Sequence, residues 1–425
     1  MNYEKCIIQI NVQKKDIDLN HPLNLFKNYK SSGTGFFIDK NMILTCYHVI
    51  EAALDINVSL IKNNQRIEIK ANIKYIFPND DLAIIEINEN DIDFLLLDFY
   101  IITNKENIFK ESVAGVNTLG YPLNSKSLIT NKGIISGFKD SLIQTDSTLN
   151  SGNSGGPLIF NNKIIGISQS KLIGDVANFG FAIPIIRFLI LWEEKKNLKL
   201  INKKPSLLFK YQEIKQKNNH YKNGVMITKI HPKSILRNTN IEINDYLLEI
   251  NNHIIDDEGN LKFNFFPEKI NLNEIHLWFP ENYQFIIKHY SRKQNQEYIN
   301  TIKLKNVNTN LIQFYPEISE KYYWENSGLI FSVFTDYHLE NIKTIEINIY
   351  QRIKLLNRFL DFNDLFTVYL ADIDFTKLKF TSYPIGDIII EINDIAFDNI
   401  DTFKKIINEP LKKIKTINNE IFFIN

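Results

Sequence analysis

The segment Ser151-Gly152-Asn153-Ser154-Gly155-Gly156-Pro157 decides the fold of this 425-residue chain, and the apolar run Leu158–Phe160 follows it directly. A serine hydroxyl is a weak nucleophile unless a base takes its proton and hydrogen-bond donors receive the charge that develops on the attacked carbonyl oxygen. Glycines on both sides of Ser154 allow a sharp turn at low steric cost, which aims the N–H groups of Gly152 and Ser154 at one point. The segment therefore predicts a nucleophilic serine and an oxyanion hole on a loop that leads into a strand.

A candidate general base lies upstream, at the end of another apolar run. Leu44-Thr45-Cys46-Tyr47-His48-Val49 follows the glycine-containing run Gly33–Ile38. We expect a strand here that ends where the imidazole of His48 can face a cleft. The other histidines are expected to be surface or structural residues: His21, His220, His231, His253, His276, His289 and His338.

A candidate acid opens the apolar run Leu82–Ile87. An aspartate at the start of a buried strand can accept the imidazole N–H, which fixes the tautomer and stabilises the imidazolium. Asp81 is favoured for this role, and Asp80 is expected to face solvent in the preceding turn. The order His48, Asp81, Ser154 is that of chymotrypsin and differs from the orders in subtilisin and the α/β-hydrolases.

The first part of the chain predicts antiparallel β-barrels. Short apolar runs separated by Gly, Asn, Asp and Pro are typical of such barrels. The runs are Ile7–Val12, Gly35–Ile38, Met42–Cys46, Ile67–Ile76, Leu82–Ile87, Lys132–Ile135 and Lys163–Gln169. Ile185–Leu198 is predicted to be one amphipathic helix, and the Lys-rich stretch that ends at Pro205 is a predicted domain boundary.

The remainder of the chain contains an internal repeat. The segment 244–252 (NDYLLEINN) is matched by 386–394 (GDIIIEIND), and each follows an apolar run that a glycine opens, at Gly224 and at Gly328. Two copies of one small module, each with the same order of strand, turn and helix, are the natural interpretation.

Composition excludes several functional classes. Lys plus Arg and Asp plus Glu both number 49, which argues against a protein that binds nucleic acid by neutralising phosphates. The two cysteines, Cys6 and Cys46, indicate a reducing compartment or a fold that needs no disulfides. No ligand spacing for a metal or organic cofactor is present, and no membrane span is expected. The first apolar run has only about four residues, shorter than a signal-peptide core.

The chain resembles the HtrA/Deg family of serine proteases. The resemblance is carried by residues 33–38, 45–49, 81–87, 120–122 (GYP), 145–158 (TDSTLNSGNSGGPL) and 178–184 (NFGFAIP). It implies a mainly β chain with a chymotrypsin-like double-barrel protease domain over residues 1–204. Two PDZ-like domains are expected to follow, over 205–308 and a more divergent 309–425. Tyr47 departs from the small residue that is usual before the histidine, so the packing beneath His48 is expected to differ.

The resemblance also implies assembly and location. The family usually forms trimers or their multiples, so we expect a homo-oligomer that acts on unfolded proteins or peptides. The opening of the chain and the divergent second module look closest to the intracellular eukaryotic Deg group. Cytoplasm or nucleus, or packaging in a virion, is therefore the expected location.

Two binding sites are predicted. A substrate pocket formed by Thr148, Leu149, Asn150, Ile167 and Ser168 carries no acid, so it is expected to accept aliphatic side chains and to reject Lys and Arg. Asp146, nearby, is expected to serve as a turn residue or as a buried hydrogen-bond acceptor. In the first PDZ-like module, peptides are expected to add a strand beside Gly224-Val225-Met226-Ile227.

Three functions fit these features. The favoured one is an ATP-independent serine endopeptidase that degrades unfolded or damaged proteins. The second is a chaperone-like scaffold with a latent or dead protease site, and the third is a structural component of a larger assembly. The complete set His48, Asp81 and Ser154 favours the first.

Overall fold

The computed structural model describes residues 3–24, 28–63, 65–89, 92–103, 115–169, 180–193, 195–203, 205–214, 223–306, 311–319, 321–341, 366–378 and 383–424. These residues divide into two compact units. The first contains residues 1–14 and 30–307, and the second contains residues 15–29 and 308–425. Among the described residues, no helix has the length and apolar character needed to cross a membrane.

The chain begins with a closed antiparallel barrel in which the strand order is β1-β2-β3-β6-β5-β4. Its strands are β1 (Ile7–Lys14), β2 (Tyr29–Asp39), β3 (Met42–Cys46), β4 (Ala53–Lys62), β5 (Gln65–Phe77) and β6 (Leu82–Ile87). Strands β3 and β6 are buried along almost their whole length, and Ile43, Leu44, Ile84 and Ile85 are completely buried. The short helix α1 (Tyr47–Ile50) follows β3, and the 3-10 turn η2 (Pro78–Asp80) precedes β6.

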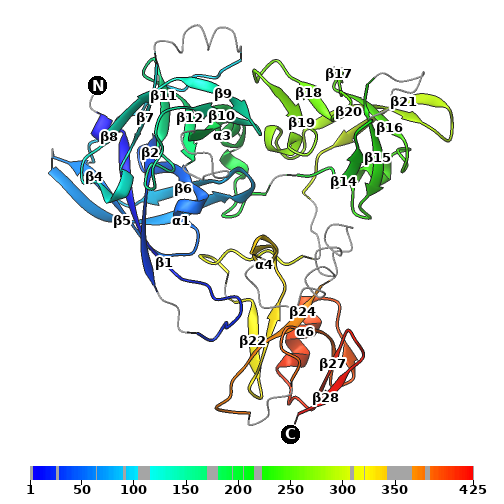
Figure 1. Cartoon of the computed structure of the whole chain (residues 1–425). Coiled ribbons are helices and arrows are strands. Elements are labelled where there is room, and N and C mark those ends of the chain that lie inside the picture. The colour runs from blue at the N-terminus through cyan, green and yellow to red at the C-terminus, as the bar shows by residue number, and fades with distance from the viewer. Residues whose placement is uncertain are drawn as a thin grey trace. The chain divides into compact units, whose positions relative to one another are not determined.

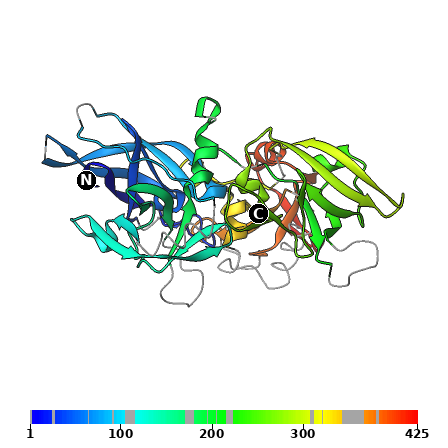
Figure 2. The ribbon, with the colours of Figure 1, turned by 90° about the horizontal axis from the view of Figure 1, so that it is seen from above.

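A second sheet of seven strands completes the chymotrypsin-like fold, with the order β8-β7-β11-β12-β13-β10-β9. Its strands are β7 (Val116–Gly120), β8 (Ile129–Gly133), β9 (Ile135–Lys139), β10 (Leu142–Thr145), β11 (Pro157–Phe160), β12 (Lys163–Gln169) and β13 (Gly180–Pro184). The predicted strand over 132–135 is wrong, because Gly133 ends β8 and Ile135 begins β9. Figure 1 shows the blue first barrel beside the cyan-to-green second sheet, and Figure 2 shows the same pair from above.

The expected single helix over 185–198 is shorter. Helix α3 (Ile185–Glu193) ends before the 3-10 turn η4 (Lys195–Asn197). Ile185, Arg187 and Phe188 form its buried face.

The first module of the repeat is a sheet with β14 (Phe209–Gln212) at its edge, followed by β15 (Val225–Ile230), β16 (Tyr246–Ile250), β20 (Gln284–Ser291) and β21 (Gln296–Lys303). The short strand β17 (His253–Ile254) pairs with β16, and β18 (Asn260–Lys262) pairs with β19 (Lys269–Asn271). Where a helix was expected, the described residues have only the 3-10 turn η6 (Ile275–Trp278), and η5 (Ile235–Asn238) lies after β15.

The second module lies in the C-terminal unit. Its strand order is β22-β23-β24-β25-β27-β28, and its strands are β22 (Tyr323–Asn326), β23 (Leu329–Val333), β24 (Val368–Ile373), β25 (Ile388–Ile392), β26 (Ile395–Ala396), β27 (Lys413–Thr416) and β28 (Ile421–Phe423). The amphipathic helix α6 (Ile400–Ile407) packs Phe403, Ile406 and Ile407 into the core, and α4 (Asp336–Glu340) follows β23. Most of residues 335–370 lie outside the described residues.

Residues 15–24 fold with this C-terminal unit, although they directly follow β1 in the sequence. Leu19 is buried in a cluster with Phe314, Tyr322 and Tyr369. The hydroxyl of Tyr322 donates to the carbonyl oxygen of Asp18 at 3.2 Å, and that of Tyr369 donates to the carbonyl oxygen of Leu19 at 3.3 Å. A boundary at residue 204 therefore separates these residues from their packing partners; the boundaries at 204 and 308 stay predictions.

Candidate active site

His48 and Asp81 form a doubly hydrogen-bonded pair where β3 and β6 come together. The Asp81 Oδ1 atom accepts the backbone N–H of His48 at 2.9 Å, and Oδ2 accepts the Nδ1–H of its ring at 2.8 Å. The backbone N–H of Tyr47 also donates to the carbonyl oxygen of Asp81 at 2.9 Å. Asp81 adopts a left-handed conformation, with φ of 52°, which turns its side chain towards α1. A carboxylate that holds Nδ1–H leaves Nε2 free to act as a base.

Gln169, at the end of β12, holds the same carboxylate from the other barrel. Its Nε2 donates to Asp81 Oδ2 at 2.6 Å. Burial by itself raises the pKa of Asp81, but hydrogen bonds from His48 and Gln169 and the charge of His48 outweigh it, so the pKa lies below its usual range. Asp81 is therefore ionised at neutral pH. The sequence analysis missed Gln169, because nothing in its local sequence marks it.

The expectation that Asp80 faces solvent is wrong. Asp80 is 2% exposed, and its Oδ1 accepts hydrogen bonds from Nε and Nη2 of Arg187 at 3.1 and 2.9 Å. Arg187 is also buried, on helix α3. Neighbouring aspartates thus have separate roles, because the turn sends Asp80 to α3 and Asp81 to His48.

The loop of Ser154 packs directly against the strand that ends at His48. A Cβ atom at Gly155 would lie 2.2 Å from both the Thr34 carbonyl oxygen and Thr45 Oγ1, and 2.9 Å from the Cys46 nitrogen. A Cβ atom at Gly152, where φ is 99°, would lie 2.5 Å from the Tyr121 carbonyl oxygen. Only glycine fits both positions, and this close approach brings the predicted nucleophile and oxyanion loop to the His48 side of the molecule.

Thr34 fixes the conformation of that loop. Its backbone N–H donates to the Ser154 carbonyl oxygen at 2.9 Å, and its Oγ1 donates to the Gly152 carbonyl oxygen at 2.7 Å. The same Oγ1 accepts the N–H of Tyr121 at 3.0 Å. These bonds hold the carbonyl groups of Gly152 and Ser154 and so fix the backbone of the predicted oxyanion loop. The Gly33-Thr34-Gly35 spacing was a signal for this residue that the sequence analysis did not use.

The predicted substrate pocket is only partly described. Thr148 and Asn150 are exposed, Leu149 is half-buried, and a Cβ atom at Gly180 would lie 2.6 Å from Leu149 Cδ1. Ile167 and Ser168 are buried, and the backbone of Ser168 bonds to Gly155 and Gly156 at the seam between the barrels. Residues 170–179, which border this region in the sequence, lie outside the described residues.

Asp146 accepts a hydrogen bond, as expected, but it is exposed rather than buried. Its Oδ1 accepts the N–H of Ile134 at 2.6 Å, which ties the residue after β10 to the connection between β8 and β9.

Cys46, His48 and Asp81 have potential ligand atoms within 4.8 Å of one another. His48 Nδ1 and Asp81 Oδ2 already bond to each other. Burial raises the pKa of the Cys46 thiol well above its usual value, so it keeps its proton. This donor set does not fit a metal ion.

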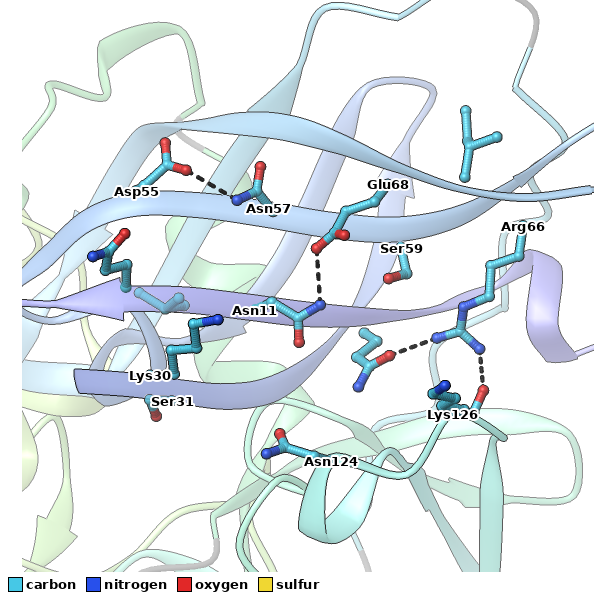
Figure 3. A pocket seen from close by; sticks show the side chains of 14 residues that line it. Asn11, Lys30, Ser31, Asp55, Asn57, Ser59, Arg66, Glu68, Asn124 and Lys126 are labelled. Carbon is cyan, nitrogen blue, oxygen red and sulfur yellow. Dashed lines mark hydrogen bonds between the residues drawn. The ribbon is translucent and has the colours of Figure 1, made fainter. Parts of the chain in front are cut away.

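A hollow of about 670 Å³ is lined mainly by polar residues of the first barrel (Figure 3). Its lining includes Gln9, Asn11, Arg66, Glu68 and Lys126, and none of His48, Asp81 or Ser154. Arg66 is occupied there by Gln9 Oε1, at 2.6 Å, and by the Lys126 carbonyl oxygen.

Strand addition at Gly224–Ile227, as predicted, does not fit the structure. Residues 225–227 begin β15, whose partners are β14 on one edge and β16 on the other. A peptide therefore finds no open edge there. β14 is instead the outer strand of this sheet.

The chain matches the family described as "Trypsin-like peptidase domain" over residues 33–167. It is 31% identical over 274 residues to Protease Do-like 4, mitochondrial, of Arabidopsis thaliana, a match that covers 59% of this chain and 50% of the relative. It is 28% identical over 272 residues to Putative protease Do-like 13 of the same plant, covering 60% and 54%. The chain thus spans about half the length of these curated relatives.

Two more matches are a bacterial sequence relative and a solved structure. A probable periplasmic serine endoprotease, DegP-like, of Rickettsia conorii is 31% identical over 204 residues, covering 43% of this chain and 38% of the relative. Among solved structures, the HtrA-type protease AlgW with decapeptide superimposes with a TM-score of 0.53 at 17% identity, covering 71% of this chain and 95% of that one. At this identity the structural match shows the fold alone.

The expected location in the cytoplasm or nucleus, or in a virion, is wrong in the light of these relatives. The names of Protease Do-like 4 and of the DegP-like protein place those relatives in mitochondria and in the periplasm.

The match to the trypsin-like peptidase domain covers most strands of the first barrel and of the second sheet. It includes the hydrogen-bonded pair His48 and Asp81 and the loop of Ser154. The chain thus contains a trypsin-like peptidase domain and is similar to serine proteases of the HtrA/Deg group.

Proposed function

We propose that the chain is an endopeptidase that cleaves unfolded or damaged proteins through an acyl-enzyme at Ser154. The observation that carries the proposal is the pair of hydrogen bonds by which Asp81 holds both the backbone and the ring of His48. An imidazole fixed in this way has one tautomer and one orientation, as general-base catalysis requires.

The proposed reaction follows from the positions of these groups. Ser154 Oγ attacks the scissile carbonyl carbon while its proton passes to His48 Nε2, and the N–H groups of Gly152 and Ser154 receive the oxyanion. The intermediate collapses when the leaving amine takes the proton from His48. Water, deprotonated by the same imidazole, then releases the acid product and restores Ser154.

Proteolysis of an unfolded protein such as casein tests this function. The intact chain is expected to cleave it, and Ser154→Ala is expected to lose about a million-fold in kcat while keeping its fold. Folded protein without cleavage of any unfolded substrate would instead favour the latent scaffold. Cleavage that Ser154→Ala leaves undiminished would rule out the assigned nucleophile.

The proposed specificity is for aliphatic residues before the scissile bond. Support comes from the uncharged segment Thr148–Asn150 and from the engagement of Asp146 with a backbone N–H group. A Lys or Arg side chain would lose its hydration without gaining a partner there. Mass-spectrometric mapping of cleavage sites in casein checks this, and a dominant preference for Lys or Arg would contradict it.

Peptide capture by the first module is proposed at the outer edge of β14 rather than at β15. A hollow of about 560 Å³ lies beside this strand, lined by Lys210, Tyr211, Gln212, Glu213 and Asn273. An extended peptide can add to such an edge through backbone hydrogen bonds. Hydrogen exchange with and without a saturating extended peptide is expected to slow at residues 209–212 and to stay unchanged at 225–227. Protection confined to 225–227 would contradict this assignment.

Assembly into a homo-oligomer is proposed on the strength of the family alone. Sedimentation of the intact chain checks it, and a monomer at all concentrations would contradict it.

A further inference from the structure

Lys14, the last residue of β1, is a buried cation outside the catalytic set. Its residue is 6% exposed, and its Nζ donates to the backbone carbonyl oxygen of His48 at 2.7 Å. Burying an ammonium group is costly unless polar groups receive its hydrogen bonds. Lys14 therefore holds one defined position, and the carbonyl group of His48 is part of what defines it.

The backbone of His48 is thus held from two directions. Asp81 Oδ1 accepts its N–H at 2.9 Å, and Lys14 donates to its carbonyl oxygen at 2.7 Å. Both contacts act on the main chain of His48. They therefore fix the backbone position from which its side chain extends. A displacement of about 1 Å in a catalytic group can cost about a hundredfold in rate.

The residues that follow Lys14 belong to the C-terminal unit. Residues 15–29 are assigned to that unit, whereas 1–14 and 30–307 form the other. Lys15 Nζ donates to the Pro316 carbonyl oxygen at 3.3 Å, and Leu19 is buried with Tyr322 and Tyr369. One peptide bond therefore joins the residue that supports His48 to a segment folded into the C-terminal core.

The strand that follows this segment contacts the loop of Ser154. The chain re-enters the first unit at β2, where Thr34 holds the carbonyl groups of Gly152 and Ser154. The connection between β1 and β2 is thus flanked by one contact to the base and one to the nucleophile loop.

We propose that Lys14 is a positioning residue for His48 and that the packing of residues 15–24 in the C-terminal unit keeps it in place. The inference rests on the proposed endopeptidase function. It makes the second module a determinant of catalytic rate, even for substrates too short to reach any peptide-binding surface.

Lys14→Met tests the first part, with Lys14→Arg as the conservative variant. On a short chromogenic peptide, Lys14→Met is expected to lower kcat about 10–100-fold with little change in KM, because ground-state binding does not depend on the imidazole. Lys14→Arg keeps a cationic donor and is expected to recover most of the rate. Equal kcat for Lys14→Met and the intact chain would overturn the proposal. An intact chain without activity would instead count against the proposed function.

The second part is tested without changing Lys14. A flexible Gly-Ser insertion of about eight residues between Lys15 and Asp16 loosens the covalent connection. The same insertion at the exposed turn between Asn418 and Asn419, in the same unit, is the matched control. The first insertion is expected to lower kcat on the short peptide at least fivefold, and the control is expected to leave it unchanged.

Should Lys14→Met fail to fold, the insertion pair still decides the question. Unchanged kcat in the chain with the insertion after Lys15 would overturn the coupling to the C-terminal unit. A loss that both insertions share equally would also overturn it, because it would reflect general damage to that unit.

Discussion

The surroundings of His48 and of His338 show how one residue type serves two purposes. His48 is partly exposed and bonded to the carboxylate of Asp81. His338 is completely buried, and its ring nitrogens bond to the hydroxyl groups of Thr335 and Ser332 at 2.7 and 3.2 Å. Of these two sites, only the first offers a negative charge to an imidazolium.

The ring contacts sharpen this difference. Tyr322, Phe334 and Tyr369 lie 5.1 to 5.9 Å from the ring of His338, measured between centroids. Burial lowers the pKa of His338 to about 3. Its role is structural, as the sequence analysis expected for every histidine except His48. A histidine becomes a base through a carboxylate partner and an open side rather than through burial.

The largest effect on kcat is expected from removing the negative charge of Asp81, which distinguishes the site of His48 from that of His338. Asp81→Asn should lower kcat about ten-thousandfold, because an amide favours the wrong imidazole tautomer. Steady-state proteolysis of a short peptide measures it, with the exposed Asp39→Asn as control. A kcat in Asp81→Asn equal to that of the unchanged chain would contradict the role assigned to the charge of Asp81.

Asp80, the residue before Asp81, should affect the free energy of unfolding more than it affects kcat. Arg187→Met leaves Asp80 buried without its ion-pair partner and is expected to cost about 3–5 kcal/mol in the free energy of unfolding. The double variant Asp80→Asn with Arg187→Met removes both charges and should recover part of that loss. Urea titration measures both, and a loss below about 1 kcal/mol in Arg187→Met would show that the pair matters little.

The buried histidine should make the C-terminal unit sensitive to acid. The pKa of His338 is about 3 in the folded chain, whereas the usual value for histidine is about 6.5. Between these two pH values, only the unfolded chain takes up the proton. Stability is therefore present above about pH 6.5 and is lost as pH falls, by about 1.4 kcal/mol per unit, down to about pH 3.

Hydrogen exchange of the amides in β22–β24, measured from pH 7 to pH 4, checks this prediction after correction for the intrinsic rate. His338→Gln is expected to flatten the dependence, even if it lowers stability at neutral pH. The same slope in both chains would assign the acid sensitivity to other groups.

The smallest effect on kcat is expected from replacing Gln169, which hydrogen-bonds to Asp81. Gln169→Leu removes the 2.6 Å hydrogen bond to Asp81 and with it one of the contacts that lower the pKa of that carboxyl group. The pKa of Asp81 should rise towards its usual range, and kcat at neutral pH should fall about tenfold. The exposed Gln294→Leu serves as control, and an unchanged kcat and pH profile in Gln169→Leu would show that Gln169 is dispensable.

The parts of the site that sequence could predict are those where chemistry demands a local pattern. The glycines around Ser154 and the position of Asp81 at the start of a strand are readable because the backbone needs them there. Gln169, Thr34, Arg187 and Lys14 were missed, since each acts on a group far away in the sequence. Arg187 and Asp80, for example, are separated by 107 positions.

The fold, like the site, could be predicted from the sequence only in part. The repeated segments 244–252 and 386–394 form matching hairpins, and the interpretation as two copies of one module stays a prediction. Both hairpin turns use left-handed residues: Asn251 and Asn252 with φ of 50° and 63°, and Asn393 and Asp394 with φ of 51° and 66°. The assignment of residues 15–24 was not predictable, because the partners of Asp18 and Leu19 lie 304 and 350 positions later. The edge of the first sheet was misassigned because strand order is a tertiary property.

Labelling with a fluorophosphonate probe tests the central claim most directly, because the probe reacts only with a serine activated by its neighbours. Intact mass and peptide mapping of the labelled chain are expected to show one adduct, on Ser154, that is absent from Ser154→Ala and strongly reduced in His48→Ala. A folded chain that takes up no label, or that carries its adduct on another residue, would contradict the assignment of His48, Asp81 and Ser154 as the catalytic residues.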